Sequence, residues 1–186
     1  MKFESIKKVV GRKFFSLYIA KYINDNGEVK EYELLSREHD LEDKGLGIKH
    51  TDAVGIIVFN PDMSKILLEK EFRLACNNWV YNFPGGLVDS GEEPEIAVAR
   101  ELKEETGLDL IEIVDKLSQA VTAVGISNET VQTYIVKATG KIRESDNVNE
   151  EIKSDWYTKE QVKEMLKRGE LFALATQRVC YMWANS

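Results

Sequence analysis

The chain has 186 residues, of which 43% are hydrophobic and 31% are charged, so it is long enough for one globular domain with a small appendage and is neither disordered nor fibrous in composition. Its formal net charge of −7 argues against a nucleic-acid backbone as partner, because such binding needs a basic surface. Cys76 and Cys180 lie far apart without metal-ligand spacing, and we recognise no signal segment or membrane-spanning run, so we expect a cytoplasmic protein with reduced thiols.

The N-terminal part of the chain carries a hairpin signal. Residues 12–22 and 30–36 are rich in aromatic and branched side chains, and the turn sequence Asn24-Asp25-Asn26-Gly27 lies between them. A two-stranded hairpin is marginally stable by itself, so its aromatic rings need a further surface to pack on. We therefore expect a homodimer formed through this hairpin. The rings concerned are Phe14, Phe15, Tyr18 and Tyr32.

A polar stretch at residues 37–49 separates the hairpin from an apolar run at 53–59, which predicts a buried strand. A change of composition of this kind marks a domain boundary. We therefore expect a hairpin subdomain with its linker at residues 1–50 and a main domain at residues 51–186.

The main domain alternates predicted strands and helices. The further strands are expected at 65–73, 79–83, 111–114 and 130–136, and the helices at 94–106, 158–168 and 175–184. This alternation favours helices packed on a sheet, an α/β fold class.

The helix at residues 94–106 is strongly acidic. Pro94 suits its first turn and Gly107 suits a left-handed cap after its end. The helical period predicts an apolar arc on one side and a carboxylate cluster on the opposite side. The arc consists of Ile96, Val98, Ala99 and Leu102, and the cluster consists of Glu101, Glu104 and Glu105. Carboxylates gathered in this way suit Mg²⁺ or Mn²⁺, although a solvated acidic helix face has the same composition.

The loop before this helix makes the pattern specific. From Gly86 onward the chain reads G-x5-E-x7-R-E-L-x-E-E-x-G-L, and every fixed position is met. These positions are Gly86, Glu92, Arg100, Glu101, Leu102, Glu104, Glu105, Gly107 and Leu108. The pattern resembles the Nudix box, and so many fixed positions in one window are far more specific than a short glycine motif.

This resemblance implies a fold, a reaction and a cofactor. The fold is an α/β/α sandwich around a mixed sheet, with the N-terminal hairpin appended to a Nudix hydrolase domain. The reaction is hydrolysis of a diphosphate linked to another moiety, with Mg²⁺ or Mn²⁺ held by the helix carboxylates. The implied metal ligands are the Gly85 carbonyl, Glu101, Glu105 and Glu104, and Glu92 braces the loop or a metal-bound water.

The resemblance also implies the remaining catalytic roles. Arg100 orients a neighbouring carboxylate, and Glu104 counts among the catalytic residues as well as the metal ligands. In the resembling branch, the base that activates water comes from a late loop, which matches Glu150 or Glu151 here. A solvated acidic loop is the alternative for that pair.

Two segments indicate a branch of the family. Glu71-Phe72-Arg73 and the residues before Gly86 resemble degenerate forms of segments found in ADP-ribose pyrophosphatases. Arg73 is retained in this segment and would clamp the diphosphate, with a lone surface arginine as the alternative, and the resemblance implies that Gly125 and Glu129 lie in a substrate-binding loop. Val124 stands where this branch carries a proline, so the loop is freer. We expect loosened selectivity among ADP-ribose and related nucleoside diphosphate sugars.

Two alternatives remain open from the sequence. An enzyme that cleaves nucleoside triphosphates or coenzyme A would share the box but usually needs no such hairpin. A non-catalytic Nudix sensor would bind a nucleotide without cleaving it, and its expected mark is a decayed box. In each case the partner is a small nucleotide, and no nucleic acid or membrane is expected.

Overall fold

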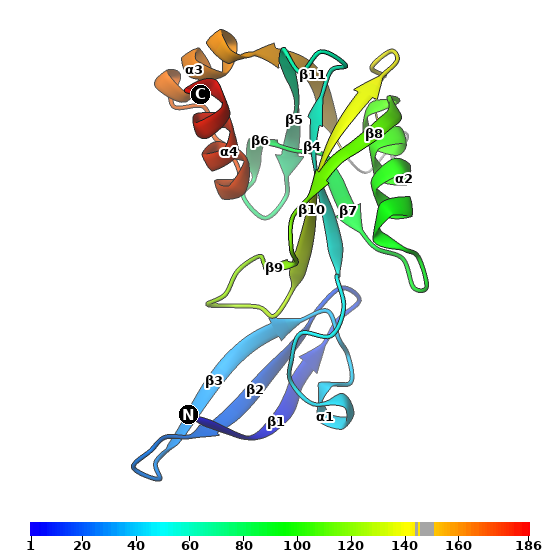
Figure 1. Cartoon of the computed structure of the whole chain (residues 1–186). Helices are drawn as coiled ribbons and strands as arrows, with labels where there is room; N and C mark the ends of the chain where they lie inside the picture. Colours follow the sequence, from blue (N-terminus) through cyan, green and yellow to red (C-terminus); the bar gives the residue numbers. More distant parts are fainter. Residues whose placement is uncertain (144, 146–150) are drawn as a thin grey trace. The chain divides into compact units, whose positions relative to one another are not determined.

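The computed structural model describes residues 1–143, 145 and 151–186. The chain divides into two compact units, which are coloured along the sequence in Figure 1. The first, called here the N-terminal unit, contains Met1–Asp52 and Gln119–Val131, and the second contains Ala53–Ser118 and Gln132–Ser186. The predicted division into residues 1–50 and 51–186 stays a prediction, and the N-terminal unit takes in a distant stretch that the sequence did not assign to it.

The N-terminal unit is built on a three-stranded antiparallel sheet. Its order is β1 (Lys2–Gly11), β2 (Ser16–Ile23) and β3 (Val29–Ser36), so the predicted hairpin is confirmed as β2 and β3. The turn closes where Gly27 N–H donates to the Asn24 carbonyl at 3.0 Å, with a positive φ of 80° at Gly27. The strand β1 was not predicted.

The core of this unit forms around Tyr18. Its ring is fully buried with Ala20, Leu34 and Leu41, the last of which begins the short helix α1 (Leu41–Lys44). The expectation that Tyr18 needs a surface outside the hairpin subdomain was therefore wrong, because the additional strand β1 and the helix α1 cover its ring. The two-residue strand β9 (Ala120–Val121) completes the unit by pairing with Thr130 and Val131.

The second unit is an α/β/α sandwich, as the sequence predicted. Its sheet has the order β11-β5-β4-β10-β8, with β6 on β5 and β7 on β4. The strands are β4 (Ala53–Phe59), β5 (Lys65–Arg73), β6 (Asn78–Asn82), β7 (Gly85–Leu87), β8 (Asp109–Lys116), β10 (Thr130–Thr139) and β11 (Ile152–Thr158). Figure 1 shows α2 (Pro94–Thr106) on one face and α3 (Lys159–Arg168) with α4 (Leu174–Ala184) on the other.

Alternation along β5 separates the two cores. Leu67 packs with the α2 side, whereas Ile66 and Leu68 pack with α3 and α4, because successive strand residues face opposite sides. The strand β11, which pairs with β5 over its whole length, was not predicted from the sequence. Within the described part of the chain, every helix is too short or too polar to cross a membrane.

Candidate active site

The loop before α2 brings two glycines against two carboxylates. Gly85 and Gly86 lie in β7, which pairs with β4. A β-carbon on Gly86 would overlap the carboxylate of Glu101, and Gly85 N–H donates to Glu105 Oε2 at 2.9 Å. The absence of a side chain at Gly86 therefore gives the Glu101 carboxylate its place against the loop.

The helix face that carries these carboxylates differs from the sequence prediction. Ile96 is 60% exposed and Ala99 is also exposed, whereas the buried stripe is Ala97, Val98, Leu102 and Thr106. At about 100° per residue, Glu101 and Glu105 fall within about 60° of Val98, so they flank the buried stripe and do not oppose it. The predicted arc was right for Val98 and Leu102 and wrong for Ile96 and Ala99, and the shifted buried stripe leaves both carboxylates beside the loop.

Glu104 behaves differently from its two neighbours on the helix. Its side chain is 55% exposed, whereas that of Glu101 is 13% exposed. The predicted cluster therefore contains two shielded carboxylates and one at the solvent edge.

Arg100 connects the helix to the loop. It donates to both oxygens of Glu92, from Nε at 2.9 Å and Nη2 at 2.8 Å, and to the Leu87 carbonyl at 3.0 Å. Its Nη1 donates to Glu101 Oε1 at 2.7 Å and lies 3.5 Å from Glu104 Oε2. A planar fork suits such divided contacts. In this arrangement Arg100 neutralises the acidic face and orients Glu101.

Glu92 holds the loop in place. Besides Arg100, its Oε2 accepts from Asp89 N–H at 3.0 Å. The hydrogen bonds from Arg100, and then that from the Asp89 backbone, lower the pKa of Glu92 to about 2. The carboxyl is thus ionised at neutral pH. Of the two roles expected for Glu92, bracing the loop or bracing a metal-bound water, its contacts fit the first.

The donor chemistry of this site fits a hard divalent cation. Glu101, Glu104, Glu105 and the backbone of Gly85 supply oxygen, which Mg²⁺ and Mn²⁺ prefer. Among the described residues, no three His, Cys, Asp or Glu side chains already converge closely enough to hold a metal ion. Arg100 Nη1 contacts Glu101 Oε1 and lies close to Glu104 Oε2, so a cation bound to these two oxygens would replace the guanidinium.

Arg73 ends β5, where its side chain is 54% exposed. Its Nη1 donates to Glu71 Oε1 at 2.7 Å. The guanidinium therefore already has an anionic partner within the same strand. The Arg73 clamp stays a prediction.

Of the two candidate bases, Glu150 and Glu151, the structure describes one. Glu150 lies outside the described residues. Glu151 is exposed, and its carbonyl accepts from Phe72 N–H at 3.0 Å, next to the start of β11. The backbone of Glu151 is therefore fixed to β5, one residue from Arg73.

The predicted substrate loop belongs to the N-terminal unit. The Gly125 carbonyl accepts from the Tyr32 hydroxyl at 2.7 Å, and Glu129 forms an ion pair with Arg37. Val124 is 84% exposed. Sequence reasoning missed Tyr32 and Arg37 as partners of this loop, although Arg37 directly follows a predicted strand.

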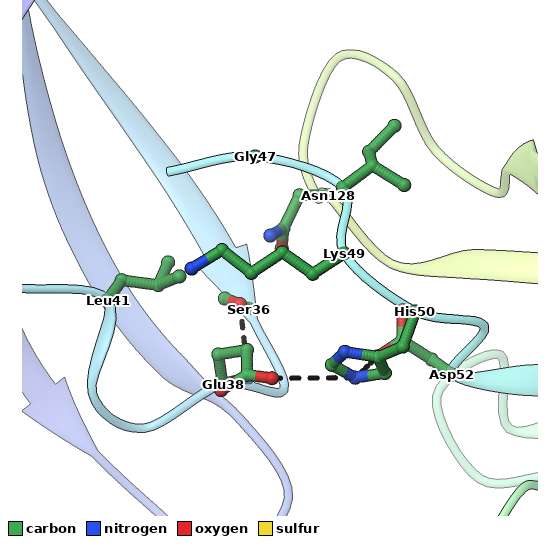
Figure 2. A pocket seen from close by; sticks show the side chains of 9 residues that line it. Ser36, Glu38, Leu41, Gly47, Lys49, His50, Asp52 and Asn128 are labelled. Atoms are coloured by element: carbon green, nitrogen blue, oxygen red, sulfur yellow. Dashed lines mark hydrogen bonds and ion pairs between the residues drawn. The ribbon is translucent and has the colours of Figure 1, made fainter. Parts of the chain in front are cut away.

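A small polar pocket also lies within the N-terminal unit, and Figure 2 shows its lining. His50 Nε2 lies 3.4 Å from Glu38 Oε1 and 3.3 Å from Asp52 Oδ1. The other oxygen of Asp52 accepts from Thr130 N–H at 2.8 Å. These contacts tie the segment before β4 to the start of β10, so the pocket is a structural network.

Comparison with known proteins settles the family. The NUDIX domain matches residues 49–175, which is most of the chain. The chain belongs to the NUDIX family. The box from Gly86 to Leu108 and the loop glycines lie inside the matched region, so the resemblance predicted from the sequence is confirmed.

Relatives and solved structures agree with this assignment. An ADP-ribose pyrophosphatase of Bacillus subtilis is 26% identical over 145 residues, covering 78% of this chain and 70% of the relative. An RNA pyrophosphohydrolase of Caulobacter vibrioides is 39% identical over 75 residues, covering 40% of this chain and 42% of the relative. The predicted enzyme class, a Nudix-type pyrophosphohydrolase, is confirmed.

A crystal structure of an ADP compounds hydrolase superposes with a TM-score of 0.67 at 19% identity, covering 90% of this chain and 84% of that one. At this identity the likeness shows the fold alone. It confirms the Nudix fold for this chain.

Proposed function

We propose that this Nudix enzyme hydrolyses the diphosphate bond of ADP-ribose or related nucleoside diphosphate sugars in a metal-dependent reaction. The observation that carries the proposal is the placement of Glu101 and Glu105 against Gly86 and Gly85, with Arg100 bracing the loop. The three-stranded N-terminal sheet favours the nucleotide-sugar branch, since that branch carries an appended N-terminal sheet.

In this proposal the chain's own residues supply orientation and proton transfer. Glu101 and Glu105 with the Gly85 carbonyl would hold Mg²⁺ or Mn²⁺, which when bound would supply charge neutralisation at the diphosphate and lower the pKa of the attacking water. Arg100 and Glu92 keep the loop in place, and Arg73 contacts a phosphate oxygen by exchanging Glu71 for it. Glu150 or Glu151 removes the proton of the attacking water.

A substrate panel tests the proposal. With Mg²⁺ present, we expect phosphate-coupled detection to show hydrolysis of ADP-ribose and other nucleoside diphosphate sugars, and excess EDTA should abolish it. The panel must contain nucleoside triphosphates and coenzyme A. If these are cleaved at far higher kcat/KM than any nucleotide sugar, the substrate class is wrong. Tight binding of ADP-ribose without cleavage would indicate a sensor.

The N-terminal sheet also motivates the proposal of a homodimer. Apolar side chains on and after β1 stay exposed in the single chain, with Val9 at 52% and Phe14 at 57%. An exposed apolar patch of this kind marks an interaction surface. We expect light scattering at micromolar concentration to give twice the chain mass of 21.2 kDa. Val9→Lys should shift the protein toward the monomer, and a monomeric unsubstituted protein would contradict the proposal.

A further inference from the structure

The strands β4 and β5 separate beside the glycine loop. The strand β11 pairs along one edge of β5, so β4 and β6 share the other edge, with β4 near the start of β5 and β6 near its end. Asn82 of β6 faces Glu69 of β5, and three residues later Gly85 faces Gly55 of β4. The segment from Asn82 to Gly85 therefore lies between β5 and β4, and Glu69 stands at its beginning.

The side chain of Glu69 lies on the face of the sheet that α2 covers. Leu67 packs in one cluster with Leu102 of α2, and Glu69 lies two residues further along β5 on the same face. The Ser154 hydroxyl donates to Glu69 Oε1 at 3.3 Å. Ser154 is itself two residues from Trp156, which packs on the same cluster. Both neighbours thus place the carboxylate in the layer between the sheet and α2.

Glu69 is almost completely buried. It is 2% exposed, and in the part of the chain that the structure describes every other Asp, Glu, Lys and Arg is more exposed. Burial of a carboxylate is costly because water no longer solvates its charge, and a neutral hydroxyl such as that of Ser154 offsets only part of the cost. A divalent cation bound nearby would offset far more of it.

The proposed cation site lies in the same layer. Gly85 N–H donates to Glu105 Oε2, so Glu105 reaches the end of the segment at whose beginning Glu69 stands. The carboxylate of Glu101 lies against Gly86, the next residue. Charges interact over longer distances in this layer than in water, because the dielectric constant of a protein interior is low. The charge of Glu69 therefore adds to the negative potential of the two helix carboxylates.

We propose that Glu69 is a positioning residue of the cation site, whose buried charge strengthens the binding of Mg²⁺ or Mn²⁺ by Glu101 and Glu105. Glu69 lies in β5, outside the box, and it acts through its electric field on the two helix carboxylates. This inference rests on the proposed function, because the cation site is part of that proposal.

The first test measures cation binding directly. Glu69→Gln removes the charge but keeps an oxygen that accepts from Ser154. Titration calorimetry of the metal-free protein with Mn²⁺ should give a dissociation constant about tenfold above that of the unsubstituted protein, as for other groups that support metal ligands. Thermal unfolding checks that the variant is folded. An unchanged dissociation constant in the folded variant would overturn the inference.

Glu112→Gln is the matched control for the loss of one negative charge. Glu112 is an exposed carboxylate on the edge strand β8, where it pairs with Lys137 at 3.0 Å. Solvent and salt screen such a charge, so this variant should bind Mn²⁺ within about twofold of the parent. A tenfold loss in this control as well would reduce the effect of Glu69 to net charge and overturn the inference.

The second test moves the charge to the neighbouring strand. Glu69→Gln combined with Ser154→Asp places a carboxylate at the residue that contacts Glu69, and Glu69→Gln combined with Ser154→Asn is the uncharged counterpart. The Mn²⁺ affinity should recover to within about threefold of the parent in the aspartate variant alone. The two double variants have nearly the same shape, so they decide the question even if Glu69→Gln alone fails to fold. Equal affinities in the two would overturn the role of the charge.

The outcomes distinguish this inference from the proposed function. If the unsubstituted protein binds Mn²⁺ but cleaves no nucleotide sugar, the proposed function fails, and the calorimetry of Glu69→Gln still decides the inference. If it binds no Mn²⁺, both fail. In an active enzyme, the Mg²⁺ concentration for half-maximal activity should rise about tenfold in Glu69→Gln, while kcat at saturating Mg²⁺ stays within about threefold. A lower kcat with an unchanged Mg²⁺ requirement would place Glu69 in the chemical step and overturn the positioning role.

Discussion

Glu105→Gln should lower turnover by at least about 100-fold while the fold stays intact. Glutamine keeps an oxygen that can accept from Gly85 N–H, the contact that Glu105 Oε2 makes at 2.9 Å, but it removes the charge of a proposed metal ligand. Steady-state kinetics over a Mg²⁺ series measures the effect, and thermal unfolding should show a shift of no more than about 4 °C, which corresponds to roughly 1 kcal/mol for a chain of this size.

Glu95→Gln is the matched control for this change. Glu95 begins the same helix and pairs with Lys116 at 3.0 Å, away from the glycine loop. It should retain turnover within about threefold, as expected for an exposed charge pair. Near-normal turnover of Glu105→Gln at saturating Mg²⁺ would exclude Glu105 as a metal ligand.

Gly86→Ala should have a comparable effect, with a loss of about 100-fold in turnover. The added β-carbon would overlap the Glu101 carboxylate, so either the loop or the proposed ligand must move. Small displacements at a catalytic site of this kind cost about two orders of magnitude in rate. The Mg²⁺ concentration for half-maximal activity should rise, which distinguishes ligand displacement from unfolding.

Gly47→Ala controls for the general cost of replacing glycine. A β-carbon at Gly47 meets no atom within 4 Å, and the residue lies in the N-terminal unit. Its turnover should stay within about twofold of the parent. If Gly86→Ala matched this control, the close approach of Gly86 and Glu101 would have no role in the reaction.

Local signals made the box and its helix predictable. Pro94 at the first turn and Gly107 in a left-handed cap, with φ of 75°, give α2 the bounds expected from the sequence. The hairpin turn at Asn24 to Gly27 and the strand β4 were also predictable, because the sequence signal of each comes from neighbouring residues only.

Elements that depend on distant partners were missed. The strand β1 is mostly exposed and rich in lysine, so no alternation of apolar residues marks it, and it is held by its pairing with β2. The sequence of β11 shows no clear alternation of apolar and polar residues around Asp155 and Trp156, so the strand could not be recognised locally. It forms because it pairs with β5.

The candidate site shows the same limit. The motif predicted Glu101 and Glu105 as site residues. Their position relative to the buried side of α2 depends on which helix residues pack on the sheet, and the motif does not give this. The ion pair of Arg37 with Glu129 joins residues 92 positions apart, and no spacing rule connects them.

The composition of the N-terminal unit has a consequence for synthesis of the chain. Buried Thr130 donates its Oγ1 to the His50 carbonyl at 2.9 Å, so the unit is completed only by residues that leave the ribosome long after its three strands. A nascent chain that ends between residues 53 and 118 carries the sheet without this last segment, and contacts so distant in sequence form slowly. A chain that begins near residue 50 would likewise lack β3, the strand that contacts residues 119–131.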